Sequence, residues 1–373
     1  MAPQNRTQLE AAYLSILERH GLKTSVLQEG MPSWFAREVF ESARRDGLDE
    51  FEAREEVDEF LLERECEEHT FSTVHEFIQS IGARVEQLVH LQGASLDQPI
   101  FFGEFPLGMY AANVQCAGNG HLVLVDIGMI MCLYHAAKVY VWSWNFQTFD
   151  DAGDPSRMST AWDTDDTLRA MATIARCYHN GNVNAAPRHQ LPTDIRLWLM
   201  AAMVQNAEMW VVAHEFSHIL NGDLEPELRT TWETNVGAVE IAAIRREQEF
   251  SADLTATNIM LADKNWSRTD VKDPGRNEVR ALLAGIALVF GFKNTLDVFG
   301  QRVLNQSRNE DLVTHPTTFE RSNAIRTAIE RKMDAELLGY FDSCLSWWRN
   351  CADLVIDKAD ADAAPFRTYD EPL

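Results

Sequence analysis

Two histidines spaced one helical turn apart constrain this chain more than any other feature. Residues 214–218 read HEFSH, an H-E-x-x-H pattern inside an apolar run, 210–220, that predicts a helix. Side chains at positions i and i+4 share one face of a helix. His214 and His218 can therefore hold one zinc ion, with Glu215 beside them as a general base toward water. Without a metal, the same pair would be ordinary core or surface histidines.

A zinc site of this kind needs a third protein ligand. A second predicted helix, 236–254, has Ala, Ile and Leu at three-to-four-residue spacing and carries Glu249. Asp253 follows one turn later on the same face and could accept the free ring N–H of a ligand histidine. Glu247 and Glu240 are alternative ligands, although neither has an acid four residues later. If no metal binds, all these acids are solvated charges.

Further motifs lie on either side of this pair of helices. Upstream, NVQC at 113–116 and GHLVLVDIGM at 120–129 predict paired strands. Downstream, EFSAD at 249–253 fits an E-x-x-A-D pattern, and HPTTFER at 315–321 adds a His-Pro pair followed by Glu-Arg. With HEFSH, these elements resemble, in the same order, the gluzincin metallopeptidases, especially the HtpX-like and CAAX-prenyl proteases. The resemblance covers residues 108–325.

The resemblance implies an α+β, mainly helical fold with a zincin-like core. In it, a small β-sheet flanks the active-site helix and binds an extended peptide along its edge strand. It implies one Zn²⁺ per chain, bound by His214, His218 and Glu249. The remaining implied roles are catalytic for Glu215 and His315, the latter stabilising an oxyanion, and supporting for Asp253 and Arg321. Alternatively, Arg321 is the oxyanion donor and His315 only precedes a helix.

One property separates this chain from those proteases, which are commonly embedded in membranes. Its longest apolar run, 281–292, is too short to cross a bilayer and predicts a buried core helix. The chain is therefore similar in character to soluble phage-exclusion peptidases of the Lit type, a similarity of metal motif and general layout.

The net charge and the cysteine pattern indicate which partners and which cellular compartment this chain suits. The formal net charge of -24 disfavours nucleic acid and anionic membranes as partners. The first ten residues lack the basic start and apolar core of a signal peptide. Six cysteines are scattered without a C-x-x-C pair, which is typical of reduced thiols in the cytoplasm. We therefore expect a cytoplasmic protein.

Composition along the chain suggests three regions. Residues 1–97 predict an acidic helical region, 98–340 the metallopeptidase core, and 341–373 a helix with an acidic tail. Between 99 and 141 the pattern is strand-like, with a hairpin at Gly118-Asn119-Gly120. The acid-rich stretch 38–68 predicts an amphipathic helix with a solvated face. Alternatively, it docks a basic protein partner or covers the active site as a lid.

These expectations converge on a soluble zinc endopeptidase that hydrolyses peptide bonds of a protein or peptide substrate, in regulated or defence-related proteolysis. Two alternatives stay open at this level. One is a non-catalytic regulatory or protein-interaction module that keeps the zincin fold. The other is a metal-free helical protein in which the H-E-x-x-H pattern is coincidental.

Overall fold

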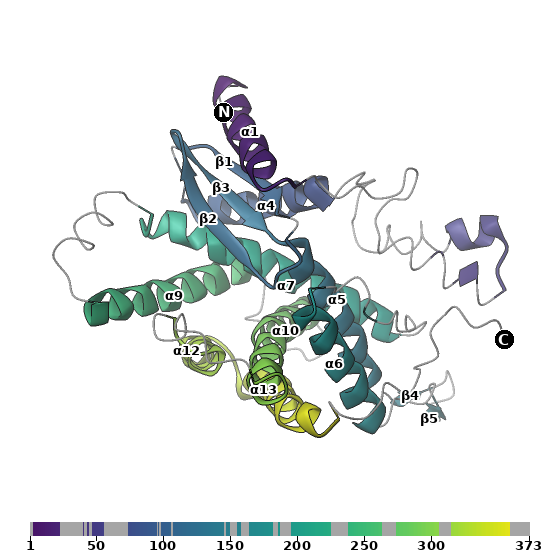
Figure 1. The fold of residues 1–373 in the computed structure, drawn as a ribbon. Helices are drawn as coiled ribbons and strands as arrows, with labels where there is room; N and C mark the ends of the chain where they lie inside the picture. The colour runs from purple at the N-terminus through teal and green to yellow at the C-terminus, as the bar shows by residue number, and fades with distance from the viewer. Residues whose placement is uncertain are drawn as a thin grey trace. The chain divides into compact units, whose positions relative to one another are not determined.

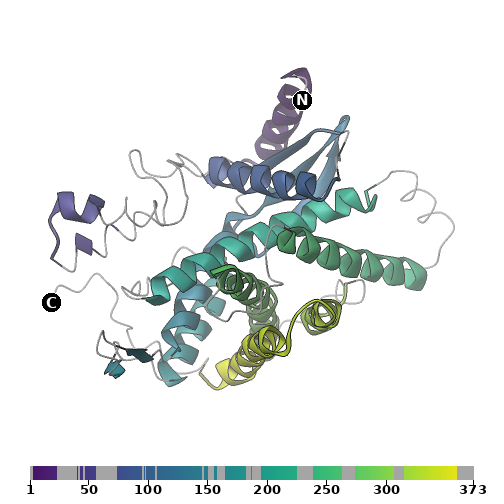
Figure 2. The same cartoon turned by 180° about the vertical axis from the view of Figure 1, so that it is seen from behind.

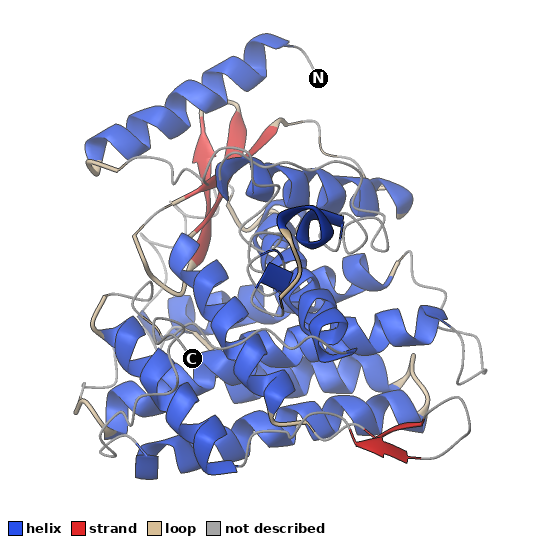
Figure 3. Ribbon diagram, turned by 90° about the vertical axis from the view of Figure 1, so that its right-hand side faces the viewer, coloured by secondary structure: helices blue, strands red, loops and turns tan. Residues whose placement is uncertain are grey.

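The fold is known from a computed structural model. It describes residues 3–22, 40, 43–44, 47–55, 74–94, 96, 98–105, 107–144, 147–149, 155–157, 164–181, 186, 195–224, 238–262, 274–305 and 315–358. The chain divides into two compact units, residues 1–129 and 130–373. Helices dominate and a small three-stranded sheet accompanies them (Figure 3), which confirms the expected mainly helical α+β class.

The first unit contains helices α1 (Pro3–Arg19) and α4 (Val74–Leu91) and strands β1 (Ile100–Glu104), β2 (Ala112–Ala117) and β3 (Gly120–Val125). The second unit contains α6 (Thr164–His179), α7 (Ile195–Leu220), α9 (Ala238–Leu261), α10 (Pro274–Arg302), α12 (Thr318–Glu330), α13 (Ala335–Leu354), the short 3-10 helix η2 (Val355–Lys358) and a two-stranded ribbon of β4 (Gln147–Phe149) and β5 (Pro155–Arg157). Helix α5 (Ile127–Trp142) begins in the first unit and continues into the second.

The sheet of the first unit has the strand order β1-β3-β2 (Figure 1). Strand β3 is central and fully buried, and it pairs in parallel with β1 and antiparallel with β2. The predicted hairpin is confirmed: Ala117 pairs with Gly120 across a two-residue turn, Gly118-Asn119. Gly118 has φ +58°, a backbone conformation that glycine adopts without strain.

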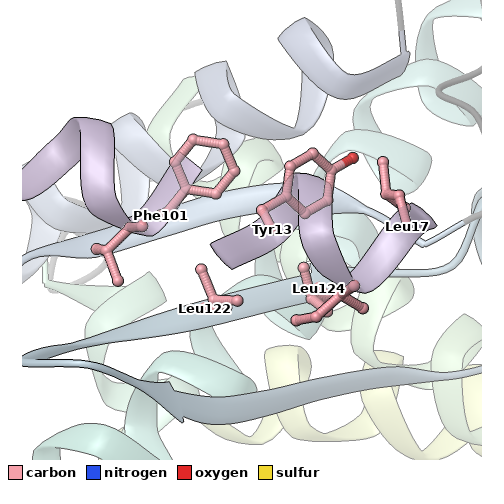
Figure 4. Close-up of a cluster of buried hydrophobic side chains, with 7 residues drawn as sticks. Tyr13, Leu17, Phe101, Leu122 and Leu124 are labelled. Atoms are coloured by element: carbon pink, nitrogen blue, oxygen red, sulfur yellow. The ribbon is translucent and has the colours of Figure 1, made fainter. Parts of the chain in front are cut away.

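Helices pack on both faces of this sheet, because side chains alternate along each strand. Tyr13 and Leu17 of α1 cover the face formed by Phe101, Leu122 and Leu124 (Figure 4). On the alternate face, Gly82 of α4 lies directly against the ring of Phe102. The helices α1 and α4 therefore form the hydrophobic core of the first unit together with the three strands.

The second unit is a helical assembly centred on α10. Helix α10 packs against α7 and α13, and α7 packs in turn against α9, which runs beside it (Figures 1 and 2). The approach of α10 to α7 depends on Gly285, where a Cβ would lie 2.8 Å from both the Ala207 nitrogen and the Met203 oxygen. This close packing fixes the helix that carries the H-E-x-x-H pattern.

Several predicted elements differ from the observed ones. The strand-like pattern expected up to residue 141 is wrong beyond Val125, because 127–142 form α5. This helix is buried almost all round, so no apolar stripe separates it from a buried strand. Residues 319–338, whose sequence predicts one helix, instead belong to two, α12 and α13, because Asp334 caps α13 by accepting from the backbone N–H groups of Glu336 and Leu337.

The apolar run 281–292 lies inside α10 and is buried, as expected, but the helix is longer than this run. By length and composition alone, Gly275–Arg302 could cross a membrane. In its most apolar window 78% of the residues are buried within the structure, as in the core helix of a globular protein.

The two compact units meet at residue 129/130, whereas the sequence suggested a boundary at 97/98. The difference arises because α1 and α4 pack on β1 and β3. The functional regions 1–97, 98–340 and 341–373 stay predictions, as does the placing of the sheet beside the active-site helix. The stretch 38–68, considered as a docking surface or lid, falls mostly outside the described residues, and 359–373 do so entirely.

Candidate metal centre

The last two turns of α7 carry both histidines of the H-E-x-x-H pattern. The Nε2 atoms of His214 and His218 lie 3.3 Å apart. The helix then ends in a Schellman turn, in which Asp223 N–H donates to the His218 carbonyl and Gly222, at φ +74°, donates to Ile219. This turn brings the Asp223 carboxylate back to the His218 ring, where its Oδ2 lies 2.8 Å from Nδ1.

Helix α9 supplies two carboxylates from one face. Glu249 Oε2 lies 3.5 Å from His214 Nε2, and Glu249 Oε1 lies 3.8 Å from His218 Nε2. One turn later, Asp253 Oδ1 lies 2.9 Å from His214 Nδ1. The i, i+4 spacing expected from the sequence thus places one acid in front of the histidines and the other behind His214.

The protonation of both rings follows from these contacts. A carboxylate only accepts hydrogen bonds, so Nδ1 of His214 donates to Asp253 and Nδ1 of His218 donates to Asp223. In the neutral rings, both Nε2 atoms then carry lone pairs that face each other. Two acceptors at 3.3 Å repel unless a proton or a metal ion lies between them. The carboxylate–histidine arrangement is the one that orients metal-ligating imidazoles in proteins.

The spacing of the three groups fits a small divalent cation. With metal–nitrogen bonds of 2.0–2.1 Å and tetrahedral angles, two imidazole nitrogens on one zinc ion lie about 3.3 Å apart. The observed separation of the two Nε2 atoms equals this value. His214, His218 and Glu249 each offer one ligand atom, and these atoms all lie within 4.8 Å of one another. This group could hold a metal ion.

Arg321 connects the two acids of α9. Its Nε and Nη2 donate to Asp253 at 2.8 and 2.6 Å, and its Nη1 lies 3.0 Å from Glu249 Oε2. The guanidinium also packs over the Phe290 ring. The donors of Arg321 are thus occupied by the carboxylates of Glu249 and Asp253. This makes Arg321 a weaker candidate for stabilising an oxyanion.

The start of α12 places Arg321 in its first turn. A capping box forms there: the Thr317 side chain accepts from Glu320 N–H, and the Glu320 carboxylate accepts from Thr317 N–H. Arg246 of α9 forms an ion pair with Glu320 at 2.8 Å and donates to the His315 carbonyl at 3.3 Å. The segment before α12 is thereby tied to the helix that carries the acids.

His315 lies at the outer side of this cluster. Its Nε2 is 3.8 Å from Glu249 Oε1, and its side chain is 48% exposed, whereas the side chain of Glu249 is 14% exposed. An imidazole that touches the ligand set and still reaches solvent can meet a bound substrate. His315 is thus the more exposed of the two residues, whereas Arg321 is engaged with Glu249 and Asp253.

The charges of the cluster are strongly coupled. Burial raises the pKa of Glu249, but His214 and Arg321 outweigh it and hold the pKa well below its ordinary value. Burial likewise opposes ionisation of Asp253, and Arg321 keeps its pKa low. For His214, burial lowers the pKa, yet hydrogen bonds to Asp253 and Glu249 raise it to about 9 overall. A proton and a metal ion therefore compete for the same Nε2 lone pair.

Glu215 is buried beside these groups. Burial raises the pKa of its carboxyl group, and the neighbouring His214 and His218 counteract part of that effect. A carboxyl group with a raised pKa holds a proton more readily than an ordinary one, as a group that accepts and returns a proton must.

The structure thus brings together every residue that the sequence proposed for the site: His214, Glu215, His218, Glu249, Asp253, His315 and Arg321. The rival ligand Glu247 is exposed on α9, and the side chain of Glu240 falls outside the described residues. Two participants escaped the sequence reasoning, Asp223 and Arg246. For Asp223 a signal existed, because an acid directly after the Asn-Gly that ends α7 must lie near the last helical turn.

Comparisons with protein-family models, with curated proteins and with solved structures find no match to this chain. The case for a function therefore rests on the geometry of these side chains.

Proposed function

We propose that this chain is a zinc-dependent peptidase of the gluzincin type, with His214, His218 and Glu249 as metal ligands. The observation that carries the proposal is the pair of Nε2 atoms 3.3 Å apart, each on a ring whose Nδ1 is held by a carboxylate. The resemblance of HEFSH, EFSAD and HPTTFER to gluzincin motifs supports the same conclusion.

Three protein ligands leave one coordination position open, as in catalytic rather than structural zinc sites. When bound, zinc would act as a Lewis acid toward water and the scissile carbonyl. Glu215 takes a proton from the attacking water and passes it to the leaving amine. His315 donates to the oxygen on which negative charge develops. Asp253 and Asp223 hold the two imidazoles in the tautomer that binds a metal.

The ligand set is tested by metal content. The full-length chain, expressed with zinc supplied, should contain about one zinc per chain by plasma mass spectrometry. Glu249→Ala should lose most of it, because one of three ligands is gone. Glu247→Ala is the matched control, since it removes an exposed glutamate from the same helix. Zinc absent from the native chain, or retained equally in both variants, would contradict the assignment.

Catalysis is tested separately with Glu215→Gln. This variant should keep its zinc and lose cleavage of an unfolded protein such as reduced casein, by about 10²–10⁴-fold for the loss of a general base. Zinc bound with no cleavage by the native chain on any unfolded protein or peptide library would instead indicate a non-catalytic module. We further propose a protein or peptide substrate and a cytoplasmic role in regulated or defence-related proteolysis.

A further inference from the structure

The turn that ends α7 also reaches across to α9. In this turn Asn221 uses both ends of its side-chain amide: Nδ2 donates to Ser251 Oγ at 3.2 Å, and Oδ1 accepts from Thr255 Oγ1 at 3.3 Å. The two hydroxyl groups lie one helical turn apart on α9, so a single amide can bridge them. The bridge joins the end of the helix that carries both histidines to the helix that carries Glu249.

The backbone of the turn holds this amide in place. Asn221 N–H donates to the Ser217 carbonyl at 2.9 Å, and the next residue, Gly222, takes the left-handed conformation that glycine allows. Asp223 follows, and its carboxylate lies against the ring of His218. Three consecutive residues thus orient one proposed metal ligand and bond to the helix of another.

The bridge meets α9 on a different side from the metal ligands. Successive residues of an α-helix are about 100° apart, so Ser251 lies about 160° around the axis from both Glu249 and Asp253. Those two acids are held on their own side by Arg321 and the histidines. A helix that is bonded on two nearly opposite sides cannot rotate about its axis without breaking one set of bonds. The bridge therefore fixes the rotation of α9, on which the position of the Glu249 carboxylate depends.

Exposure separates the bridge from the cluster that it serves. Asn221 is exposed, and Ser251 and Thr255 are half-buried, whereas Asp253 is fully buried. Removing the bridge therefore leaves its polar groups in reach of water and should cost little stability. Its effect on the metal centre can be measured in a chain that stays folded.

We propose that Asn221 is a positioning residue of the metal centre. Through its two hydroxyl partners it sets the rotation of α9, and so holds Glu249 at the spacing from the two histidines that a metal ion requires. The assignment rests on the proposed function in one respect, since it takes Glu249 and these histidines as metal ligands. Asn221 itself binds neither the metal ion nor the substrate.

Zinc affinity of the full-length chain, measured by competition with chromogenic chelators, is the direct test. Asn221→Ala should bind zinc about tenfold more weakly or worse, as when a partner outside the ligand set is lost. Ser251→Ala combined with Thr255→Val removes the same bridge from the side of α9, leaves the turn at Asp223 intact, and should show the same loss. The matched control is Asn206→Ala, because the Asn206 amide bonds to the Ala202 carbonyl within α7. It should keep the native affinity.

A double-mutant cycle with Glu249→Ala separates positioning from a general structural effect. Once the Glu249 carboxylate is gone, Asn221 has no ligand to position, so adding Asn221→Ala should leave the residual zinc affinity unchanged. Equal weakening in both backgrounds, or native affinity in Asn221→Ala, would overturn the proposal.

Failure of the proposed function has a different signature in the same measurement. The native chain would then bind no zinc, or Glu249→Ala would bind it as tightly as the native chain does. Either result would remove the ligand that Asn221 is proposed to position, and the positioning role with it. Native zinc binding that depends on Glu249 and not on Asn221 would overturn the positioning role alone.

Discussion

The buried carboxyl group of Glu208 should make the stability of this protein depend on pH in a predictable direction. Its pKa is about 8 in the folded chain, against an ordinary value of 4.5 that also describes the unfolded chain. Between these two values the folded state holds a proton that the unfolded state has released, so stability falls as pH rises. One unit corresponds to about 1.4 kcal/mol, and the whole interval therefore to about 5 kcal/mol.

Glu208→Gln removes this titration and keeps the shape of the side chain. The variant should match the wild type at about pH 4, and gain on it progressively up to about pH 8, by about 3–5 kcal/mol of unfolding free energy. Urea unfolding followed by circular dichroism, with both chains stripped of metal by a chelator, measures the difference at each pH. Glu247→Gln, at an exposed position, should stay within about 0.5 kcal/mol of the wild type throughout.

The refuting result is a Glu208→Gln difference that does not change with pH. It would mean that the carboxyl is ionised in the folded chain, with a partner or water that satisfies it.

Three further outcomes follow from the contacts. Asp223→Ala should weaken metal binding about 10–100-fold in a competition with a chromogenic chelator, because the His218 ring loses the group that orients it. Gly285→Ala should lower the unfolding free energy by about 1–3 kcal/mol in urea titration, since the new methyl meets the backbone of α7 at Ala207. Arg246→Ala should leave zinc content unchanged but lower kcat about 10–100-fold in casein hydrolysis, because the segment before α12 loses its tie to α9.

The grouping of side chains at the candidate metal site was largely predictable, because its parts are local. HEFSH and EFSAD each place two functional groups one helical turn apart, a relation that depends on helix geometry alone. Asn221-Gly222 is a signal for the end of a helix that can be read from the sequence, but its consequence for Asp223 depends on the turn that forms there. Asp223 was therefore missed, although Asn221 and Gly222, which position it, carry a signal in the sequence.

Other features needed the tertiary structure. Helix α5 looked like a continuation of the strands because it is apolar on all sides and shows no helical stripe. Glu208 stood out little in the sequence, as one acid in a long helix that also carries Glu215. Its interest comes from burial without a partner, which no spacing rule reveals.

Arg321 supplies a counter-charge that allows this cluster of acids to form without a metal ion. The carboxylates of Glu249 and Asp253 are buried together, and without a cation their repulsion would disfavour packing of α9 against α7. Arg321 contacts both, and it lies in the first turn of α12, whose capping box is formed by Thr317 and Glu320, neither of which is a proposed metal ligand. The metal-free chain therefore has its own counter-charge, unlike small zinc domains that unfold without metal.

Chelation should accordingly leave the far-ultraviolet circular dichroism of the native chain nearly unchanged. The midpoint of thermal unfolding should fall only by the amount that corresponds to the lost binding free energy of the metal ion. The Arg321→Leu variant keeps an apolar side chain but lacks the charge. In this variant, chelation should instead lower the helix content measured by circular dichroism. Loss of helix on chelation of the native chain would show that the metal, and not Arg321, holds α7, α9 and α12 together.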